Sequence, residues 1–323
     1  MSAHHHGPGH GHGHGHGHGH GHGHGHGHGH GDGEGDYDFD WEAMADRLER
    51  EAELRSDAME ESVAWLRGLL LEGGCGAASV GRVIDLGSGP GVSTAALAHG
   101  FPQAETVAVD GAAGLLERAR ARAAREGLAD RVTAVRADLP EGLDGLGAAD
   151  LVWTSHVVHH LGDQQAALGA LAGTLTPGGV LAVREGGLPL RFLPRDIGLG
   201  RPGLQARLDA ANEEWFGEMR DDLPDAVRTV EDWPAMLAAA GLTPTGSRTF
   251  VTELRAPLGE TAREHLVAYA SRAREALADR LAKDDVDTLD ALLDDASPHS
   301  LRTRPDVFLL VGATVHTGMK RAA

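Results

Sequence analysis

The chain has 323 residues, 41% of them apolar and only 4% aromatic, which is enough for one large domain or two small ones. Its 29 basic and 48 acidic residues give a net charge of −19 with neutral histidines, and this disfavours nucleic acid as a partner because phosphate binding needs clustered Lys and Arg. Cys75, the only cysteine, excludes an internal disulfide, and the lack of a long apolar run or signal-peptide core predicts a cytoplasmic protein without a membrane partner.

Residues 1–36 form a tail of low complexity, in which glycine and histidine alternate before a short acidic stretch. Because such a segment combines high backbone entropy with nothing apolar to bury, we expect it to be disordered. Neutral imidazoles are ligands of divalent transition metals, so the composition indicates nickel or zinc capture by residues such as His10, His12, His14 and His16. An expression tag is the other explanation of this tract.

Two helices are expected across residues 37–75. Apolar residues recur at helical spacing over 41–71, and Asp57 and Glu60 have the spacing of a capping box. The helices should therefore join near Ser56. They either cover the ligand site or simply pack against the following sheet.

From Arg82 onward, short β-branched runs alternate with helical stretches. We expect strands at 82–86, 106–110, 132–137, 150–153 and 180–183, helices at 92–99, 115–126 and 164–175, and a break at 177–179. Strands separated by such helices pair in parallel with right-handed crossovers, which predicts an α/β, doubly wound sheet. The arginines of the second helix (Arg118, Arg120, Arg122 and Arg125) are expected to form a solvated face.

The rest of the chain adds helices between two further strands. Expected elements are helices at 204–219 and 232–241, a strand at 249–254, a helix started by a Thr261–Glu264 capping box, and a strand at 306–315. Residues 189–230 and 257–300 are then helical insertions. Trp215 and Phe216 are the concentrated aromatics of the first insertion, either as part of a lid or as core anchors.

The most informative stretch is 83–91, a buried strand that runs into a glycine loop. A dinucleotide fingerprint would follow Gly87 and Gly89 with a third glycine at position 92, which is Val92. The loop instead places its third glycine at Gly91. This G-x-G-x-G pattern resembles motif I of the class I S-adenosylmethionine (SAM) methyltransferases.

Acidic residues close the first three strands in the order that a SAM site requires. Asp85 can fix the loop and face the cationic end of SAM, Asp110 can take the ribose hydroxyls, and Asp138 can accept from the adenine amino group. The residues expected to bind SAM are Asp85, Gly87, Ser88, Gly89, Gly91, Asp110, Gly111, Asp138, Leu139 and Ser155. The resemblance covers 80–185 closely and 231–318 loosely, and it implies a mostly parallel, seven-stranded, Rossmann-like sheet within a domain spanning 80–323.

The fourth strand and the residues after it indicate the kind of acceptor. The run 149–161 resembles the fourth motif of small-molecule methyltransferases and lacks the Asn/Asp-Pro-Pro-aromatic motif of enzymes that methylate nucleic-acid bases. A small-molecule acceptor is therefore expected. His156 and His159, with His160 beside them, are candidate bases, the alternative being that they brace the loop by hydrogen bonding.

The leading hypothesis is a SAM-dependent methyltransferase that acts on a small molecule. One alternative is a SAM-binding protein without turnover that acts in metal binding through its histidine-rich tail. A nicotinamide-dependent oxidoreductase is disfavoured by the missing third glycine of its fingerprint. The sequence leaves open the acceptor, the atom that is methylated and the oligomeric state.

Overall fold

The computed structural model describes residues 41, 43–72 and 80–322, so the tail 1–36 and its expected metal ligands lie outside the described residues. The strands are β1 (Arg82–Leu86), β2 (Glu105–Asp110), β3 (Val132–Arg136), β4 (Ala149–Ser155), β5 (Leu175–Arg191), β6 (Thr243–Leu254) and β7 (Leu309–Met319). The helices are α1 (Ala45–Leu54), α2 (Ser56–Glu72), α3 (Val92–Gly100), α4 (Ala113–Arg125), α5 (Gln164–Gly173), α6 (Leu204–Asp221), α7 (Trp233–Ala239), α8 (Glu260–Ala276) and α9 (Lys283–Leu293). Short 3₁₀ turns, η2 (Glu141–Gly145) and η3 (Val158–His160), follow β3 and β4. None of the helices among these residues is long and apolar enough to cross a membrane.

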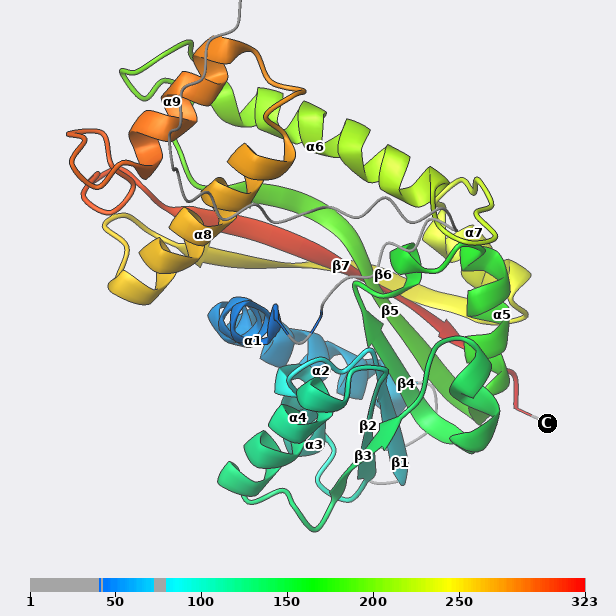
Figure 1. The fold of residues 1–323 in the computed structure, drawn as a ribbon. Coiled ribbons are helices and arrows are strands. Elements are labelled where there is room, and N and C mark those ends of the chain that lie inside the picture. The colour runs from blue at the N-terminus through cyan, green and yellow to red at the C-terminus, as the bar shows by residue number, and fades with distance from the viewer. Residues whose placement is uncertain (1–40, 42, 73–79, 323) are drawn as a thin grey trace, which may run out of the picture. The chain divides into compact units, whose positions relative to one another are not determined.

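The strands form one sheet in the order β3-β2-β1-β4-β5-β7-β6 (Figure 1). Strands β1 to β5 pair in parallel, whereas β7 runs antiparallel to both β5 and β6. The predicted doubly wound, mostly parallel, seven-stranded sheet is therefore confirmed. The strand order reverses between β1 and β4, and the carboxyl ends of the strands at such a switch point are where ligands bind in open α/β sheets.

Alternating side chains of the strands build a core on each face of the sheet. Val83 of β1 belongs to a buried cluster with residues of α2 and α3, whereas its neighbour Ile84 belongs to a cluster with residues of α5 and α7. This is the two-residue period of a strand buried on both faces. Helix α1 ends at Leu54 and α2 begins at Ser56, which agrees with the predicted join.

Strand β5 is much longer than the predicted strand over Val180–Val183. It begins at Leu175 and continues to Arg191, because β7 pairs with it from Val180 onward. The expected break at 177–179 is wrong, since a register shift against β4 accommodates the Pro-Gly-Gly sequence there. Pro189, where the first insertion was expected to begin, therefore lies within β5, and the insertion follows Arg191.

The insertions have a buried core of their own. Residues of α6, α8 and α9 pack on the far ends of β5 and β7, around Phe192, Leu266 and Leu289 (Figure 1). The expected capping box of α8 is wrong, because the helix begins at Glu260 with Gly259 as its N-cap, so Thr261 and Glu264 lie inside it.

The expectation that the arginines of α4 are all solvated is also wrong. Arg122 is buried and forms ion pairs with Glu49 at 2.7 Å and with Glu53, both in α1. The helical pattern could not show this, because the partners lie about 70 residues earlier in the chain.

Candidate active site

The glycine loop after β1 lies close to the residues that follow β4. A Cβ atom on Gly87, whose φ is +68°, would lie 2.2 Å from Cγ2 of Val157, so no other residue fits there. Gly89 has a φ of +53°, but a Cβ atom on it would meet nothing within 4 Å. The loop is thus tightly packed at its start and open at its middle, where a ligand can approach the backbone.

Ser88 lies between these two glycines, and the environment of its hydroxyl group is unusual. Its hydroxyl is buried, yet it has no hydrogen-bond partner among the described residues. A buried hydroxyl without a partner costs free energy. Its position in an open glycine loop fits a polar ligand group, such as the amino-acid end of SAM, as its missing partner.

Asp85 connects β1 to α3. Its Oδ2 accepts a hydrogen bond of 2.6 Å from Oγ1 of Thr94, and the side chain is only 1% exposed. Burial raises the pKa of Asp85 to about 7, the hydrogen bond from Thr94 opposes this shift, and the charge of Asp110 adds to it. Near neutral pH a cationic ligand would therefore favour the ionised form of Asp85.

Asp110, at the end of β2, holds the glycine loop from the other side. Its Oδ2 accepts from the backbone N–H of Gly89 at 2.9 Å and its Oδ1 from that of Ala112 at 3.0 Å. Burial raises the pKa of Asp110, while these backbone hydrogen bonds lower it. Each oxygen keeps a second lone pair that can accept from a hydroxyl group.

The predicted residues that follow β2 and β3 also meet. A Cβ atom on Gly111 would lie 2.8 Å from Oδ1 of Asp138, so the two loops are in contact. Leu139 is partly buried and packs against the core cluster on the α5 and α7 face. The carboxylates that close β1, β2 and β3 therefore lie along one edge of the sheet.

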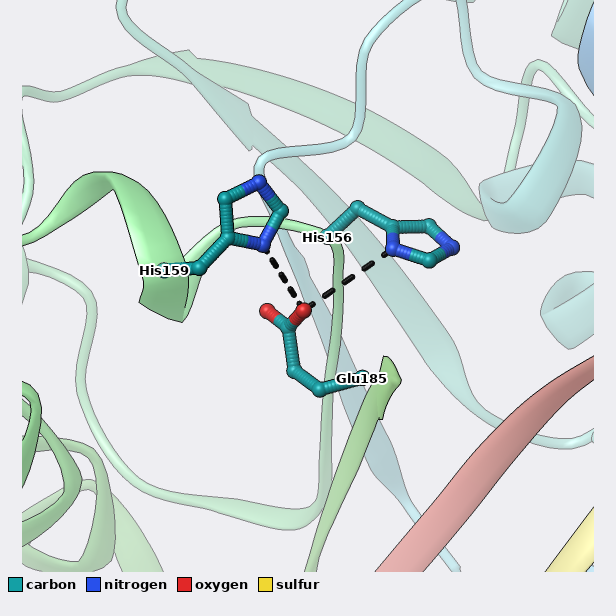
Figure 2. Close-up of side chains that lie close together, drawn as sticks. All are labelled: His156, His159 and Glu185. Atoms are coloured by element: carbon teal, nitrogen blue, oxygen red, sulfur yellow. Dashed lines mark hydrogen bonds and ion pairs between the residues drawn. The ribbon is translucent and has the colours of Figure 1, made fainter. Parts of the chain in front are cut away.

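Glu185 of β5 is a site residue that the sequence analysis missed. Its Oε1 accepts from the backbone N–H groups of Val157 and Val158, each at 3.0 Å. Its Oε2 faces Nδ1 of His159 at 2.8 Å and Nδ1 of His156 at 3.8 Å (Figure 2). The only signal in the sequence was an acidic residue at the end of an apolar strand.

His156 has an unusual backbone conformation. Its φ is +55°, a region that residues other than glycine rarely adopt and that is common at functional sites. The side chain is 40% exposed, but the dense protein around it and then the charges of Arg184 and Arg55 hold its pKa well below the usual value. His156 is therefore neutral near pH 7.

Aromatic side chains surround the neighbouring histidines. The ring of Phe216, in α6, lies 5.5 Å from that of His159, and the ring of Trp41 lies 5.2 Å from that of His160. Burial lowers the pKa of His160 to about 4. The first insertion, through Phe216, and the start of the described chain, through Trp41, thus both contact the histidines of this site, as residues of a lid would have to do. Trp215, the neighbour of Phe216, is half-buried.

The donor atoms of His156, His159 and Glu185 lie within 4.8 Å of one another, a spacing that a divalent metal ion could bridge. A metal ion would have to displace the hydrogen bond between His159 and Glu185 and leave Glu185 to serve two backbone amides as well. The existing hydrogen bonds fully account for the arrangement. The hydrogen bond between His159 and Glu185 links the loop after β4 to β5.

Known proteins resemble this chain in the same region. A family profile described as a methyltransferase domain matches residues 84–181. A trans-aconitate 2-methyltransferase of Rhodopseudomonas palustris (strain BisA53) is 33% identical over 220 residues, which cover 59% of this chain and 77% of that protein.

Two further similarities are less extensive. A trans-aconitate 2-methyltransferase of Methylobacterium radiotolerans is 45% identical over 103 residues, which cover 31% of this chain and 36% of that protein. The structure of an O-methyltransferase family protein from Burkholderia thailandensis superposes with a TM-score of 0.47 at 18% identity, covering 88% of this chain and 60% of the other.

Proposed function

The chain belongs to the class I SAM-dependent methyltransferases, and from this premise we propose that it methylates a carboxylate oxygen of a small organic acid. The observation that carries the proposal is the single edge of the sheet at which the glycine loop, Asp110 and the loop after β4 meet. The acceptor class is supported by the names of the relatives, which act on trans-aconitate.

SAM supplies a methyl group that its sulfonium makes electrophilic. We infer that the open backbone at Gly89 and the orphaned hydroxyl of Ser88 bind its amino-acid end. Asp85 in its ionised form faces the positive charge, and Asp110 accepts from the ribose hydroxyls. Asp138 and Leu139, after β3, hold the adenine, and Ser155 closes the site at the end of β4.

An ionised carboxylate has no proton to lose, so this reaction needs alignment and exclusion of water rather than a base. We therefore assign Glu185 and His159 as positioning residues. They fix the loop after β4 through the backbone N–H groups of Val157 and Val158 and the His159 ring. If the acceptor were instead a hydroxyl compound, His159 would be the base, since Glu185 leaves its Nε2 atom available.

The experiment is a turnover assay with SAM and a panel of mono-, di- and tricarboxylic acids and hydroxyl compounds, followed by mass spectrometry. Methyl esters are cleaved by mild alkali and methyl ethers are not, so the product identifies the reacting group. The His159→Gln variant should retain carboxylate methylation within about tenfold, because removal of a true base costs about 10²- to 10⁴-fold. Formation of alkali-stable products alone would overturn the assignment.

We also propose that the histidine-rich tail binds metal ions. Its composition supports capture of nickel or zinc by residues 1–36 as a property separate from methyl transfer.

A further inference from the structure

We propose that Arg184 selects the acceptor by binding a carboxylate other than the one that is methylated. This inference rests on the proposed function and adds the residue by which the acid is recognised.

Arg184 lies at the carboxyl end of β5, beside the end of β4. Its backbone oxygen accepts from the N–H of His156 at 3.0 Å, and it pairs with Ser155 across the two strands. Two residues earlier, Ala182 packs in the cluster on the α2 and α3 face, whereas Val183 packs on the opposite face. By strand alternation Arg184 therefore lies on the same face of the sheet as α2 and α3, while Glu185 lies on the opposite face.

The guanidinium of Arg184 has a polar contact but no counter-ion. Its Nη1 donates to Oγ of Ser155 at 3.1 Å, and no described carboxylate lies within ion-pair distance of it. The nearby carboxylates are engaged elsewhere. Glu51 pairs with Arg55 at 2.8 Å, and Glu185 serves His159 and two backbone amides.

The surroundings make this lack of a counter-ion costly. Burial and, to a smaller extent, the like charge of Arg55 lower the pKa of Arg184 to about 10, although the charges of Glu51 and Glu185 oppose this shift. A half-buried cation without an opposite charge is unfavourable unless a ligand supplies one. An anionic acceptor bound beside Arg184 would supply the opposite charge that the described residues do not place within ion-pair distance of its guanidinium.

A guanidinium binds a carboxylate through two parallel hydrogen bonds, and a small organic acid with two carboxylates can supply one of them to Arg184. An ion pair with the guanidinium lowers the nucleophilicity of the carboxylate held there, so we assign the reaction to another carboxylate of the acceptor. In the transfer itself, a lone pair of a second carboxylate forms the new O–C bond. The C–S bond breaks, its electron pair stays on sulfur, and the products are a methyl ester and S-adenosylhomocysteine.

The test compares two acceptors and three variants of the full chain. The acceptors are a dicarboxylate that the wild type methylates and its counterpart in which one carboxylate is a carboxamide. The variants are Arg184→Gln, Arg184→Lys and, as a matched control, Arg255→Gln, whose side chain is 84% exposed beyond the end of β6. S-adenosylhomocysteine affinity and melting temperature are measured for each.

We expect Arg184→Gln to raise the KM for the diacid by about 10- to 100-fold, the loss typical of a charge-assisted pair. The KM for the monoamide should change by less than about threefold, since a neutral carboxamide forms no ion pair with the guanidinium. The KM of Arg184→Lys for the diacid should lie between those of Arg184→Gln and the wild type, and the KM of Arg255→Gln should equal that of the wild type.

An equal loss on both acceptors, or a loss of S-adenosylhomocysteine affinity with it, would mean that Arg184 is structural and would overturn the inference. If Arg184→Gln melts early, Arg184→Lys decides, because it keeps the charge but not the paired geometry. Ester formation by the wild type with equal KM for diacid and monoamide overturns this inference alone. Absence of any ester product overturns the proposed function as well.

Discussion

Replacement of Asp85 by asparagine should change how the stability of the fold depends on pH. The carboxyl is buried and bonded to Thr94, and its pKa is about 7 in the folded chain against 3.8 when it is free. Between these two values the folded chain binds more protons than the unfolded chain. The contribution of Asp85 to the free energy of unfolding therefore falls as the pH rises from about 4 to about 7 and is constant above that.

The size of the effect follows from these two pKa values. Relative to a fully protonated group, Asp85 lowers the free energy of unfolding by about 2 kcal/mol at pH 5 and about 4 kcal/mol at pH 8. Asparagine has the same shape but does not ionise, so this loss is absent in the variant. The stability of Asp85→Asn relative to the wild type should thus rise by about 2 to 3 kcal/mol between pH 5 and pH 8.

Urea unfolding of both proteins at pH 5, 6, 7 and 8 without ligand measures this difference. The change with pH is the informative quantity, because an unpaired amide N–H₂ group in the variant adds a cost of about 1–3 kcal/mol that does not depend on pH. Asp130→Asn, at an exposed position before β3, is the control and should follow the wild type at every pH. Parallel profiles of Asp85→Asn and the wild type would refute the reasoning, because Asp85 would then titrate alike in the folded and unfolded chains.

Three other changes separate the cofactor site, the aromatic contact and the tail. If Asp110 binds the ribose as proposed, Asp110→Ala removes two hydrogen bonds of about 1.5–3 kcal/mol each, and calorimetry should show at least a tenfold loss of SAM affinity. An unchanged affinity would place the ribose elsewhere. Phe216→Ala removes a ring 5.5 Å from that of His159, and should lower kcat/KM with SAM affinity and melting temperature near wild type, whereas a core anchor would lose about 3–5 kcal/mol of stability. Deletion of 1–36 should leave SAM affinity and the unfolding midpoint unchanged in metal-free buffer, while the full chain binds nickel or zinc more weakly below about pH 6; loss of SAM binding on deletion would make the tail structural.

The parts of the site that the sequence predicted are those encoded locally. Asp85 lies one residue before the end of β1 and Asp110 ends β2, each strand is recognisable by itself, and the carboxyl ends of parallel strands share one edge of the sheet. Glu185 differs, because its role depends on how β4 and β5 pair. Only that register brings its carboxylate beneath the backbone of Val157 and Val158.

The same reason explains why Arg122 was placed on the wrong surface. Alternating arginines on a helix normally face solvent, but here α1 supplies Glu49 and Glu53 as partners. Glu51, two residues after Glu49, forms an ion pair with Arg55 just after α1, and the charges of this pair act on His156 and Arg184. Helix α1, next to this ion pair, is thus held against α4 by the buried side chain of Arg122. A contact that periodicity assigns to solvent therefore fixes the electrostatics of the candidate active site, and this link exists only in three dimensions.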